Sequence, residues 1–490
     1  MKGSPVAQLP FDRIYPAAAQ VLGQMDDDAW AQLEGLVGRL INHQGTFGYW
    51  YEGRRISENP FPGGYAGRGA LMREAMTFIS DHGLLLEGFA WFDWWSNEGE
   101  PLLEGDAVCS AEELSPEQAL RLITCITHGD RFAEGALLRY FDNRSMPRLL
   151  ARIASFRPDP IWRGVLRGCA YGDAWGNRNE FRSYTMLVYD DVRGPGLPAH
   201  LVVTDDTQMT LSFARALNGA SRKTDSELRN DIIDEFVLWL DETDSSRTPG
   251  MTCVEAVANL AKGLAWTAAT VAASDGCGTV MRVSPAAFLP EGRWQPVASW
   301  QAAITHGAAA GIAGSLLTAA IIRSAAEANL TAGRVTAAAL ELAAEPSLRR
   351  NVTQWLVGHP LAEELADLDR FLDGGFATVR DCLQRAQAAI ARFQRDPWGE
   401  DPCAYAGEGW RAQQTLATAL LCVDALADEP IDALRRATVT GGDSDSIAAV
   451  AGSILGALHR NPWPPDWFDR LEPRYKEWIA EAELYDFDSD

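Results

Sequence analysis

The sequence lacks several features that would place the protein in common classes. None of its eight cysteines belongs to a Cys-x-x-Cys pair, and none lies at a zinc-binding spacing from a histidine. We therefore expect reduced, mostly buried thiols in a cytoplasmic protein. Met1–Pro5 carries no apolar segment, so no secretory signal is expected. The alanine-rich stretch from Gly307 to Ile322 is short and weakly apolar, which favours a buried helix over a membrane span.

Basic residues are also scarce. The chain has 43 Lys and Arg against 67 Asp and Glu, a net charge of −24. This balance argues against binding to nucleic acid or to anionic membranes, and we expect neither partner. A hydrophobic content of 47% is typical of a globular protein. A length of 490 residues exceeds one ordinary core and predicts two domains.

Residues 1–155 differ from the rest in being rich in aromatic side chains, which gather at Phe47–Tyr51 and at Phe89–Trp95. Apolar spacing predicts helices over residues 29–41 and 115–127. Ser115 is an expected N-cap of the second, with Pro and Gln at favourable positions behind it. Residues 47–65 contain turn residues and predict loop or short strand. The pattern predicts a smaller, mostly helical N-terminal domain.

A linker is predicted at Arg157–Pro160, because two prolines in four residues prevent a helix from running through. Beyond it, Ala, Gly and Leu recur at spacings of three and four, and runs of β-branched residues are few. Small residues at these spacings are typical of helices whose backbones approach closely. We therefore predict a mostly α second domain over residues 161–490.

Two short acidic motifs stand out in this second domain, Thr204–Met209 and Gly441–Ser446. Each opens a predicted helix, and Asp at a helix start is commonly only a cap. Taken together, however, they contain four carboxylates, which would repel one another strongly unless cations neutralised them. If the fold joins them, they predict an oxygen-only site for one or two hard divalent cations, and hence a metal-dependent enzyme.

Glycine-containing motifs accompany the acids. Gly168–Gly176 is followed by Glu180 but not by the Lys-Ser/Thr of a phosphate-binding P-loop, so its glycines are expected to allow close helix packing. Asp173 within it is expected to be a buried structural acid. Gly276–Pro285 offers glycine amides that a diphosphate could approach. Its Arg282 could pair with a phosphate or carboxylate, or could form an ion pair inside the protein.

Two further segments are ambiguous or structural by composition. His306, in Thr305–Gly307, lies beside an apolar helix, where a histidine is more often a core residue than a catalyst. The segment from Gly409 to Leu421 is expected to be purely structural.

The order of these motifs resembles the ADP-ribosylglycohydrolase family, the relatives of the dinitrogenase-reductase-activating glycohydrolase. In order, the chain has Gly-Asp-Ala-x-Gly with a following Glu, Thr-Asp-Asp-Thr-x-Met, Gly-x-Gly-x-x-Met-Arg-x-x-Pro, Thr-His, Gly-Trp and Gly-Gly-Asp-x-Asp-Ser. The resemblance covers residues 161–467, and its specificity comes from the order of six individually weak motifs. It implies an all-α bundle that holds two Mg²⁺ or Mn²⁺ ions.

The resemblance also implies residue roles. It assigns one ion to Thr204, Asp205, Asp206 and Asp445, and the other to Asp443, Asp445 and Ser446. It makes Glu180 a mobile residue that can reach the second ion and help catalysis. For the proton transfers we expect Asp205 or Asp206 as base and Glu180 as a second acid or base, and which acid takes which role is not readable from the sequence. The residues implied to contact ADP-ribose are Gly276, Cys277, Gly278, Thr279 and His306.

The chain departs from the family pattern in three places. Ser446 stands where Thr is usual, which keeps the hydroxyl oxygen, and Gln414 stands where an acid is common. Cys277 replaces a usual Asn, which puts the details of nucleotide binding in doubt. In the first domain, Trp94–Trp95 and His128–Gly135 resemble a small uncharacterised bacterial domain, which implies no chemistry.

The sequence thus predicts a metal-dependent hydrolase that removes ADP-ribose from a modified acceptor, with ADP-ribosyl-arginine on protein as the leading substrate. Such an enzyme could counter an ADP-ribosyltransferase toxin. One alternative is a binding or immunity module that occludes such a transferase through the N-terminal domain. Another is a di-metal phosphohydrolase. The linkage, the physiological target and the oligomeric state are not readable from the sequence.

Overall fold

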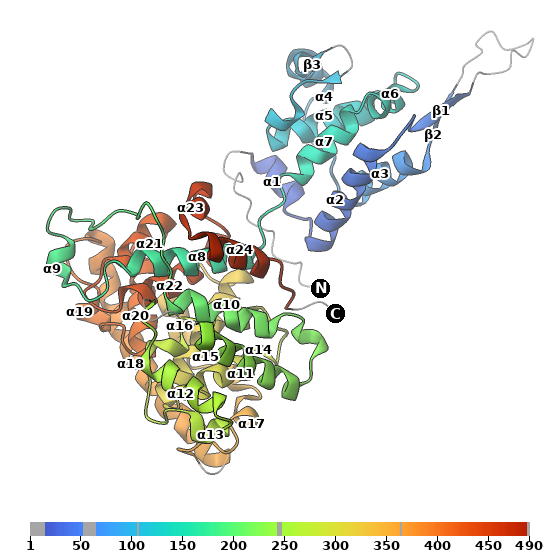
Figure 1. Cartoon of the computed structure of the whole chain (residues 1–490). Coiled ribbons are helices and arrows are strands. Elements are labelled where there is room, and N and C mark those ends of the chain that lie inside the picture. The colour runs from blue at the N-terminus through green and yellow to red at the C-terminus, as the bar shows by residue number, and fades with distance from the viewer. Residues whose placement is uncertain (1–14, 52–64, 105–106, 243–246, 363–364, 488–490) are drawn as a thin grey trace, which may run out of the picture. The chain divides into compact units, whose positions relative to one another are not determined.

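The computed structural model describes the chain except for residues 1–14, 52–64, 105–106, 243–246, 363–364 and 488–490. The chain divides into two compact units, Met1–Pro158 and Asp159–Asp490 (Figure 1). The division falls inside the proline-containing segment Arg157–Pro160. Each unit has a hydrophobic core of its own.

The described residues of the first unit are mostly helical, with two short pairs of antiparallel strands. Its elements are α1 (Pro16–Leu22), α2 (Asp27–Asn42), β1 (Gly48–Tyr51), β2 (Tyr65–Arg68), α3 (Ala70–Asp81), α4 (Trp91–Trp94), β3 (Leu103–Glu104), β4 (Ala107–Val108), α5 (Pro116–Gly129), α6 (Ala136–Asp142) and α7 (Ser145–Ala154).

Local sequence explains where several of these elements begin. Ser115 and Gln118 form the expected capping box: the Ser115 hydroxyl accepts from the Gln118 N–H at 3.1 Å, and the Gln118 amide oxygen accepts from the Ser115 N–H at 2.9 Å. The expected short strand near Phe47 is β1, in which Gly48 pairs with Arg68 of β2. Residues 52–64 of that segment lie outside the described residues.

The second unit is helical, and the all-α class predicted for the chain is confirmed. Its helices are α8 (Ile161–Gly176), α9 (Tyr184–Leu187), α10 (Asp205–Leu217), α11 (Asp225–Glu242), α12 (Met251–Ala261), α13 (Trp266–Ala269), α14 (Trp294–Ala303), α15 (Ala309–Ala326), α16 (Val335–Leu342), α17 (Val352–Trp355), α18 (Leu365–Arg395), α19 (Cys403–Ala406), α20 (Ala412–Ala425), α21 (Pro430–Thr438), α22 (Ser444–Leu458), α23 (Pro465–Arg470) and α24 (Pro473–Ala482).

Helix α15 lies in the core of this unit. Among the described residues it is the helix long and apolar enough to cross a bilayer, but 72% of its most apolar window is buried inside the protein. It packs against α14, α18 and α22. This agrees with the buried helix expected over Gly307–Ile322.

Helices α8 and α22 pack with their backbones in contact. A Cβ atom at Gly172 would lie 2.1 Å from the carbonyl oxygen of Ala448, and one at Gly176 would lie 2.3 Å from that of Ser444. Neither position has room for a side chain, as expected from the glycine spacing. Because the two helices lie this close, the start of α22 with its acidic motif is held beside the end of α8.

Candidate active site

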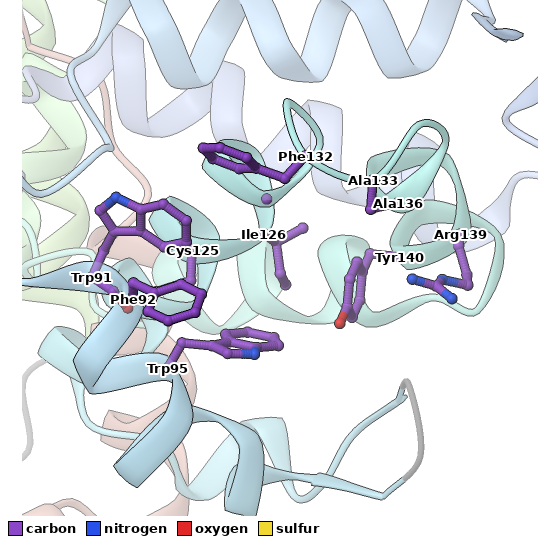
Figure 2. A pocket seen from close by; sticks show the side chains of 11 residues that line it. Trp91, Phe92, Trp95, Cys125, Ile126, Phe132, Ala133, Ala136, Arg139 and Tyr140 are labelled. Carbon is purple, nitrogen blue, oxygen red and sulfur yellow. Dashed lines mark hydrogen bonds between the residues drawn. The ribbon is translucent and has the colours of Figure 1, made fainter. Parts of the chain in front are cut away.

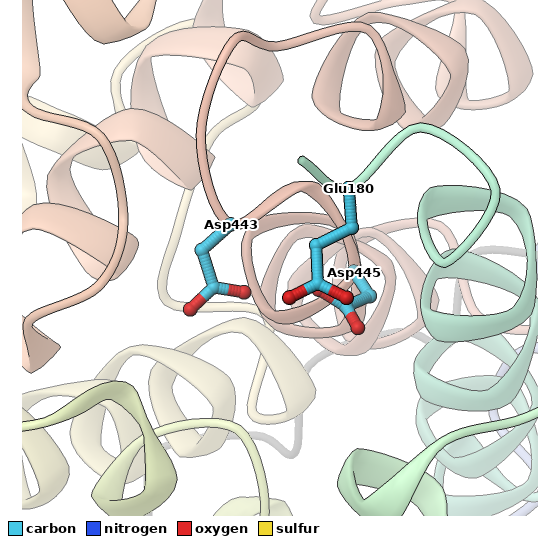
Figure 3. Close-up of side chains that lie close together, drawn as sticks. All are labelled: Glu180, Asp443 and Asp445. Atoms are coloured by element: carbon cyan, nitrogen blue, oxygen red, sulfur yellow. The ribbon is translucent and has the colours of Figure 1, made fainter. Parts of the chain in front are cut away.

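Acidic side chains from three segments of the second unit meet at the starts of α10 and α22, in the last turn of α8 and just beyond its end. We call this group the acid cluster; its members are Asp173, Glu180, Asp205, Asp206, Asp443 and Asp445. The aspartates are buried, and Glu180 is half-buried at the edge. Carboxylate oxygens of Glu180, Asp443 and Asp445 all lie within 4.8 Å of one another (Figure 3).

The two acidic motifs are joined directly. The hydroxyl of Ser446, on α22, donates a hydrogen bond to Oδ1 of Asp206, on α10, at 3.3 Å. Asp205 is close enough to Glu180 and Asp445 for their charges to affect one another. The structure therefore brings together Thr204, Asp205 and Asp206 from one motif with Asp443, Asp445 and Ser446 from the other.

Burial raises the pKa of every acid in the cluster, and for all of them except Asp445 the charges of neighbouring acids raise it further. For Asp206, burial is the largest cause, and the charges that add to it belong to other cluster acids, first among them Asp445 and Asp173. The pKa of Glu180 rises to about 9 by burial and by the charge of Asp445. Without a bound cation, these groups hold protons that free carboxylic acids would have lost.

The cluster fits hard divalent cations. Oδ2 of Asp206 is buried and accepts no hydrogen bond from the described residues, which leaves a carboxylate oxygen without the partner that burial requires. Its neighbours supply carboxylate and hydroxyl oxygens, the ligand type that Mg²⁺ and Mn²⁺ prefer. A cation here would also relieve the repulsion that raises the pKa values.

Asp173 positions the first turn of α10. It accepts hydrogen bonds from the backbone N–H of Thr204 at 2.9 Å and of Thr207 at 3.1 Å, and from the hydroxyl groups of both. Asp173 is fully buried, as a structural acid is expected to be. The Thr204 hydroxyl also caps α10 by accepting from the Asp206 N–H, so the capping interpretation of this motif applies as well.

The turn before α22 is held by Glu408 and by Gly409, the first residue of the segment that we expected to be purely structural. The Asp443 N–H donates to the carbonyl oxygen of Glu408 at 2.8 Å. Gly409 has a φ of +88°, and a Cβ atom there would lie 3.1 Å from that of Asp443. The segment therefore shapes the site. Its Gly-Trp motif, which belongs to the expected order of motifs, was the sequence feature that could have indicated this role.

An aromatic pair lies next to Glu180. The rings of Phe181 and Trp410 stack with their centroids 5.6 Å apart and their planes at 21°. Phe181 is 74% exposed and has a φ of +62°, a backbone conformation that is uncommon for a residue with a side chain. Sequence interpretation did not find this pair, because the two residues are far apart in the chain.

The Gly276–Thr279 loop borders the acid cluster. The Cys277 N–H donates to the carbonyl oxygen of Trp410 at 3.2 Å. Burial raises the pKa of the half-buried Cys277 thiol well above its usual value, and the charge of Asp443 adds to the rise. A Cβ atom at Gly278 would lie 2.7 Å from the sulfur of Cys253, so the loop backbone lies directly on its neighbours.

The imidazole of His306 lies under this loop. Its Nε2 is 3.1 Å from where a Cβ atom at Gly276 would be, and its Nδ1 is 2.8 Å from the hydroxyl of Thr305. Burial lowers the pKa of His306 well below its usual value, and the nearby Arg282 lowers it further, so the ring is neutral. His306 is buried and lies beside the Gly276–Thr279 loop, with which the family resemblance grouped it as a contact of ADP-ribose.

Arg282 has a role inside the protein rather than toward a ligand. Its guanidinium donates to the side chain of Gln301 at 2.8 Å and to the hydroxyl of Thr305 at 2.7 Å, and it lies over the ring of Phe236 at 4.7 Å. These partners are neutral, so Arg282 is held inside the protein by neutral groups and not by the internal ion pair that the sequence allowed.

Comparison with known proteins agrees with this geometry. Residues 161–487 match the model of the family described as ADP-ribosylglycohydrolase. The chain belongs to the ADP-ribosylglycohydrolase family. The match covers nearly all of the second unit, from Ile161 to Phe487, and includes every member of the acid cluster. Residues 25–159 match a family of unknown function, DUF6508, in agreement with the uncharacterised domain that the sequence suggested.

Individual relatives cover the same part of the chain. An uncharacterised protein of Archaeoglobus fulgidus is 27% identical over 336 residues, which is 66% of this chain and 96% of the relative. A solved structure described as an ADP-ribosylglycohydrolase-related protein complex is 24% identical, with a TM-score of 0.44; the similarity covers 66% of this chain and 96% of that one.

Family membership makes the second unit a hydrolase of ADP-ribose linkages. The family generally depends on metal ions, and the acid cluster is a fitting place for them.

Proposed function

We propose that the protein is a divalent-metal-dependent hydrolase that releases ADP-ribose from arginine side chains of modified proteins, including proteins modified by an ADP-ribosyltransferase toxin. The observation that carries the proposal is the acid cluster, in which Glu180, Asp443 and Asp445 present carboxylate oxygens within 4.8 Å of one another in a family of ADP-ribose hydrolases. The site of action is proposed to be the cytoplasm.

The two motifs would hold two Mg²⁺ or Mn²⁺ ions. Thr204, Asp205, Asp206 and Asp445 would bind one, and Asp443, Asp445 and Ser446 the other. Ions bound there would orient the ribose hydroxyls and act as Lewis acids toward the water that is consumed. Asp173 would keep Thr204 in place through the hydrogen bonds described above.

Proton transfer would fall to the acids at the edge of the cluster. Cleavage breaks the bond between the anomeric carbon of the ribose and a nitrogen of the acceptor, and water supplies a hydroxyl to the carbon and a proton to the nitrogen. Glu180 is half-buried and can exchange protons with solvent, which suits it to give or take that proton. Asp205 and Asp206 are the alternative bases. Both are buried, so Glu180 is favoured.

The charge of the protein supports an arginine acceptor. A net charge of −24 attracts a cationic guanidinium more than a neutral hydroxyl. The test is an ADP-ribose-release panel with the full chain on arginine-linked, serine-linked, acetyl-ester and nucleobase-linked ADP-ribose, with Mg²⁺ and with a strong chelator. We expect ADP-ribose to be released only from the arginine conjugate, and only when Mg²⁺ is present.

Each other outcome of the panel has a distinct meaning. Release from another linkage would correct the acceptor and keep the enzyme class. Equal release in chelator would overturn the metal dependence. Formation of inorganic phosphate in place of free ADP-ribose would replace the proposal with a phosphohydrolase.

A further inference from the structure

Large apolar side chains are exposed at several places on the described part of the chain. In the first unit, aromatic rings that include Trp91, Trp95 and Phe132 line a cavity of about 450 Å³ (Figure 2). In the second unit, exposed apolar side chains gather in residues 181–193, which we call the rim segment. The rim segment begins directly after Glu180 and therefore starts at the edge of the acid cluster.

Internal contacts hold the rim segment in place. The hydroxyl of Tyr184 donates a hydrogen bond to the carbonyl oxygen of Trp398 at 2.8 Å, and the side chain of Leu187 is buried. Asp191 accepts a hydrogen bond from the guanidinium of Arg435, on α21, at 3.0 Å. The segment is therefore fixed to the rest of the unit at several points along its length.

The apolar side chains of the rim segment are nevertheless exposed. Tyr189 is 86% exposed and Met186 is 69% exposed, and Phe181 and Val192 are also more than half exposed. A segment that is held by internal contacts more often buries such side chains and leaves polar ones in water. Aromatic residues and Met are enriched where proteins contact one another, and exposed apolar side chains that lie together mark such contacts. The rim segment thus has the composition of a docking surface.

The rim segment is joined to the part of the site that faces the acceptor. Phe181 stacks on Trp410, whose carbonyl oxygen accepts from the N–H of Cys277 in the loop that borders the acid cluster. In the proposed mechanism Glu180 gives a proton to the acceptor nitrogen, so the acceptor must lie within reach of Glu180. Residues that continue the acceptor chain then lie next to Phe181 and the rest of the rim segment.

The rim segment and the turn before it are neutral. Residues 178–193 contain as many Arg side chains as Asp and Glu side chains together, whereas the whole chain has 67 acids against 43 bases. Charge complementarity is therefore not what selects a partner here. The exposed apolar side chains favour a partner that presents apolar side chains of its own.

We propose that the rim segment docks the protein that carries the modified arginine, and that it binds apolar side chains next to that arginine. This docking role rests on the proposed function, because it takes ADP-ribosyl-arginine on protein as the substrate. It makes the enzyme selective for arginines in apolar surroundings over small arginine conjugates.

The test compares three arginine conjugates with the full chain at saturating Mg²⁺. One is ADP-ribosyl-agmatine, and the others are peptides with a single ADP-ribosyl-arginine, flanked by leucines in one and by serines in the other. We expect kcat/KM for the leucine peptide to exceed that for ADP-ribosyl-agmatine about tenfold through a lower KM, as one well-packed apolar contact provides. The serine peptide should be cleaved no better than ADP-ribosyl-agmatine.

A double variant tests the segment itself. Met186→Ser combined with Tyr189→Ser removes two exposed apolar side chains outside the acid cluster. It should lower kcat/KM for the leucine peptide to that for ADP-ribosyl-agmatine, while the turnover of ADP-ribosyl-agmatine and the thermal unfolding midpoint stay unchanged. Leu484→Ser, an 80% exposed position on another segment, is the matched control and should leave all three conjugates as they are.

The outcomes separate the docking role from the proposed function. Failure of the original protein to cleave any arginine conjugate would overturn both. If ADP-ribosyl-agmatine is cleaved but the two peptides are cleaved equally well, the proposed function stands and the docking role is wrong. The same holds if the double variant leaves the leucine peptide unaffected or slows ADP-ribosyl-agmatine to the same extent.

Discussion

The Ser446 hydroxyl donates a hydrogen bond to Asp206 at 3.3 Å, although 240 residues of sequence separate the two. This contact joins the start of α22 to the start of α10, so that the N-termini of both helices lie at the acid cluster. Negative charge is stabilised at helix N-termini, which lowers the cost of gathering so many acids. It does not remove that cost, because the pKa values of the cluster stay raised.

The first prediction concerns stability without metal. In the unfolded chain these carboxyl groups have pKa values near 4, whereas the folded values reach about 8 for Asp205 and about 9 for Glu180. Groups with raised folded values stabilise the protein below the unfolded pKa and lose that contribution as the pH rises through the folded pKa. In the presence of a chelator, the thermal unfolding midpoint of the protein should therefore fall as the pH rises from about 4 to about 9.

Added Mg²⁺ should reverse that fall, because the cation neutralises the charges that destabilise the folded state. Calorimetry at pH 5 and at pH 8 measures both effects, and the stabilisation by Mg²⁺ should be larger at pH 8. Equal stabilisation at both values, or none, would contradict metal binding at the acid cluster.

The second prediction concerns Asp206→Asn. Loss of this carboxylate should lower ADP-ribose release at saturating Mg²⁺ by roughly 100-fold or more, beyond what loss of an outer-sphere partner costs. In the presence of a chelator at pH 8, the thermal unfolding midpoint of the variant should be equal to or higher than that of the original protein, because one of several repelling charges is gone. Asp381→Asn, an exposed position on α18, is the matched control and should change neither. A variant that turns over normally would remove Asp206 from the proposed site.

The third prediction concerns Asp173→Asn, which keeps the shape of the side chain but not its capacity to accept every hydrogen bond from Thr204 and Thr207. Because Asp173 acts through Thr204, the affinity for Mg²⁺ should fall by about 10- to 100-fold. Release at saturating Mg²⁺ should fall much less than in Asp206→Asn. Titration of Mg²⁺ followed by activity and by the unfolding midpoint separates the two effects. A loss that saturating metal does not restore would indicate that Asp173 takes part directly.

The fourth prediction concerns the contact between α8 and α22. Gly172→Ala places a Cβ atom 2.1 Å from the Ala448 carbonyl oxygen, so the helices must separate. The free energy of unfolding should fall by about 1 to 3 kcal/mol, as in other overpacked cores. Mg²⁺ should also bind more weakly, because Asp445 lies in the first turn of α22 and Asp443 is its N-cap.

Gly374→Ala in α18 is the matched control for that variant. A Cβ atom there meets nothing within 4 Å, so the substitution should stabilise the protein by up to about 1 kcal/mol. Chemical denaturation of both variants gives the comparison. Equal effects of the two substitutions would show that the helices can separate at little cost.

The sequence by itself determined the helical character, the glycine spacing of α8 and the two acidic motifs. These depend on local properties: periodicity, backbone freedom and the charge of adjacent side chains. The capping box at Ser115 was predictable for the same reason, since it involves residues three positions apart.

The tertiary structure decided everything that depends on distance across the chain. It brought Asp206 to Ser446, set the Glu408 carbonyl under Asp443, stacked Phe181 on Trp410 next to Glu180, and turned Arg282 inward to neutral partners. It also opened a cavity among the aromatic residues of the first unit. A linear sequence shows which side chains are available, but only packing fixes which of them share a volume, because each such contact joins residues that the sequence keeps far apart.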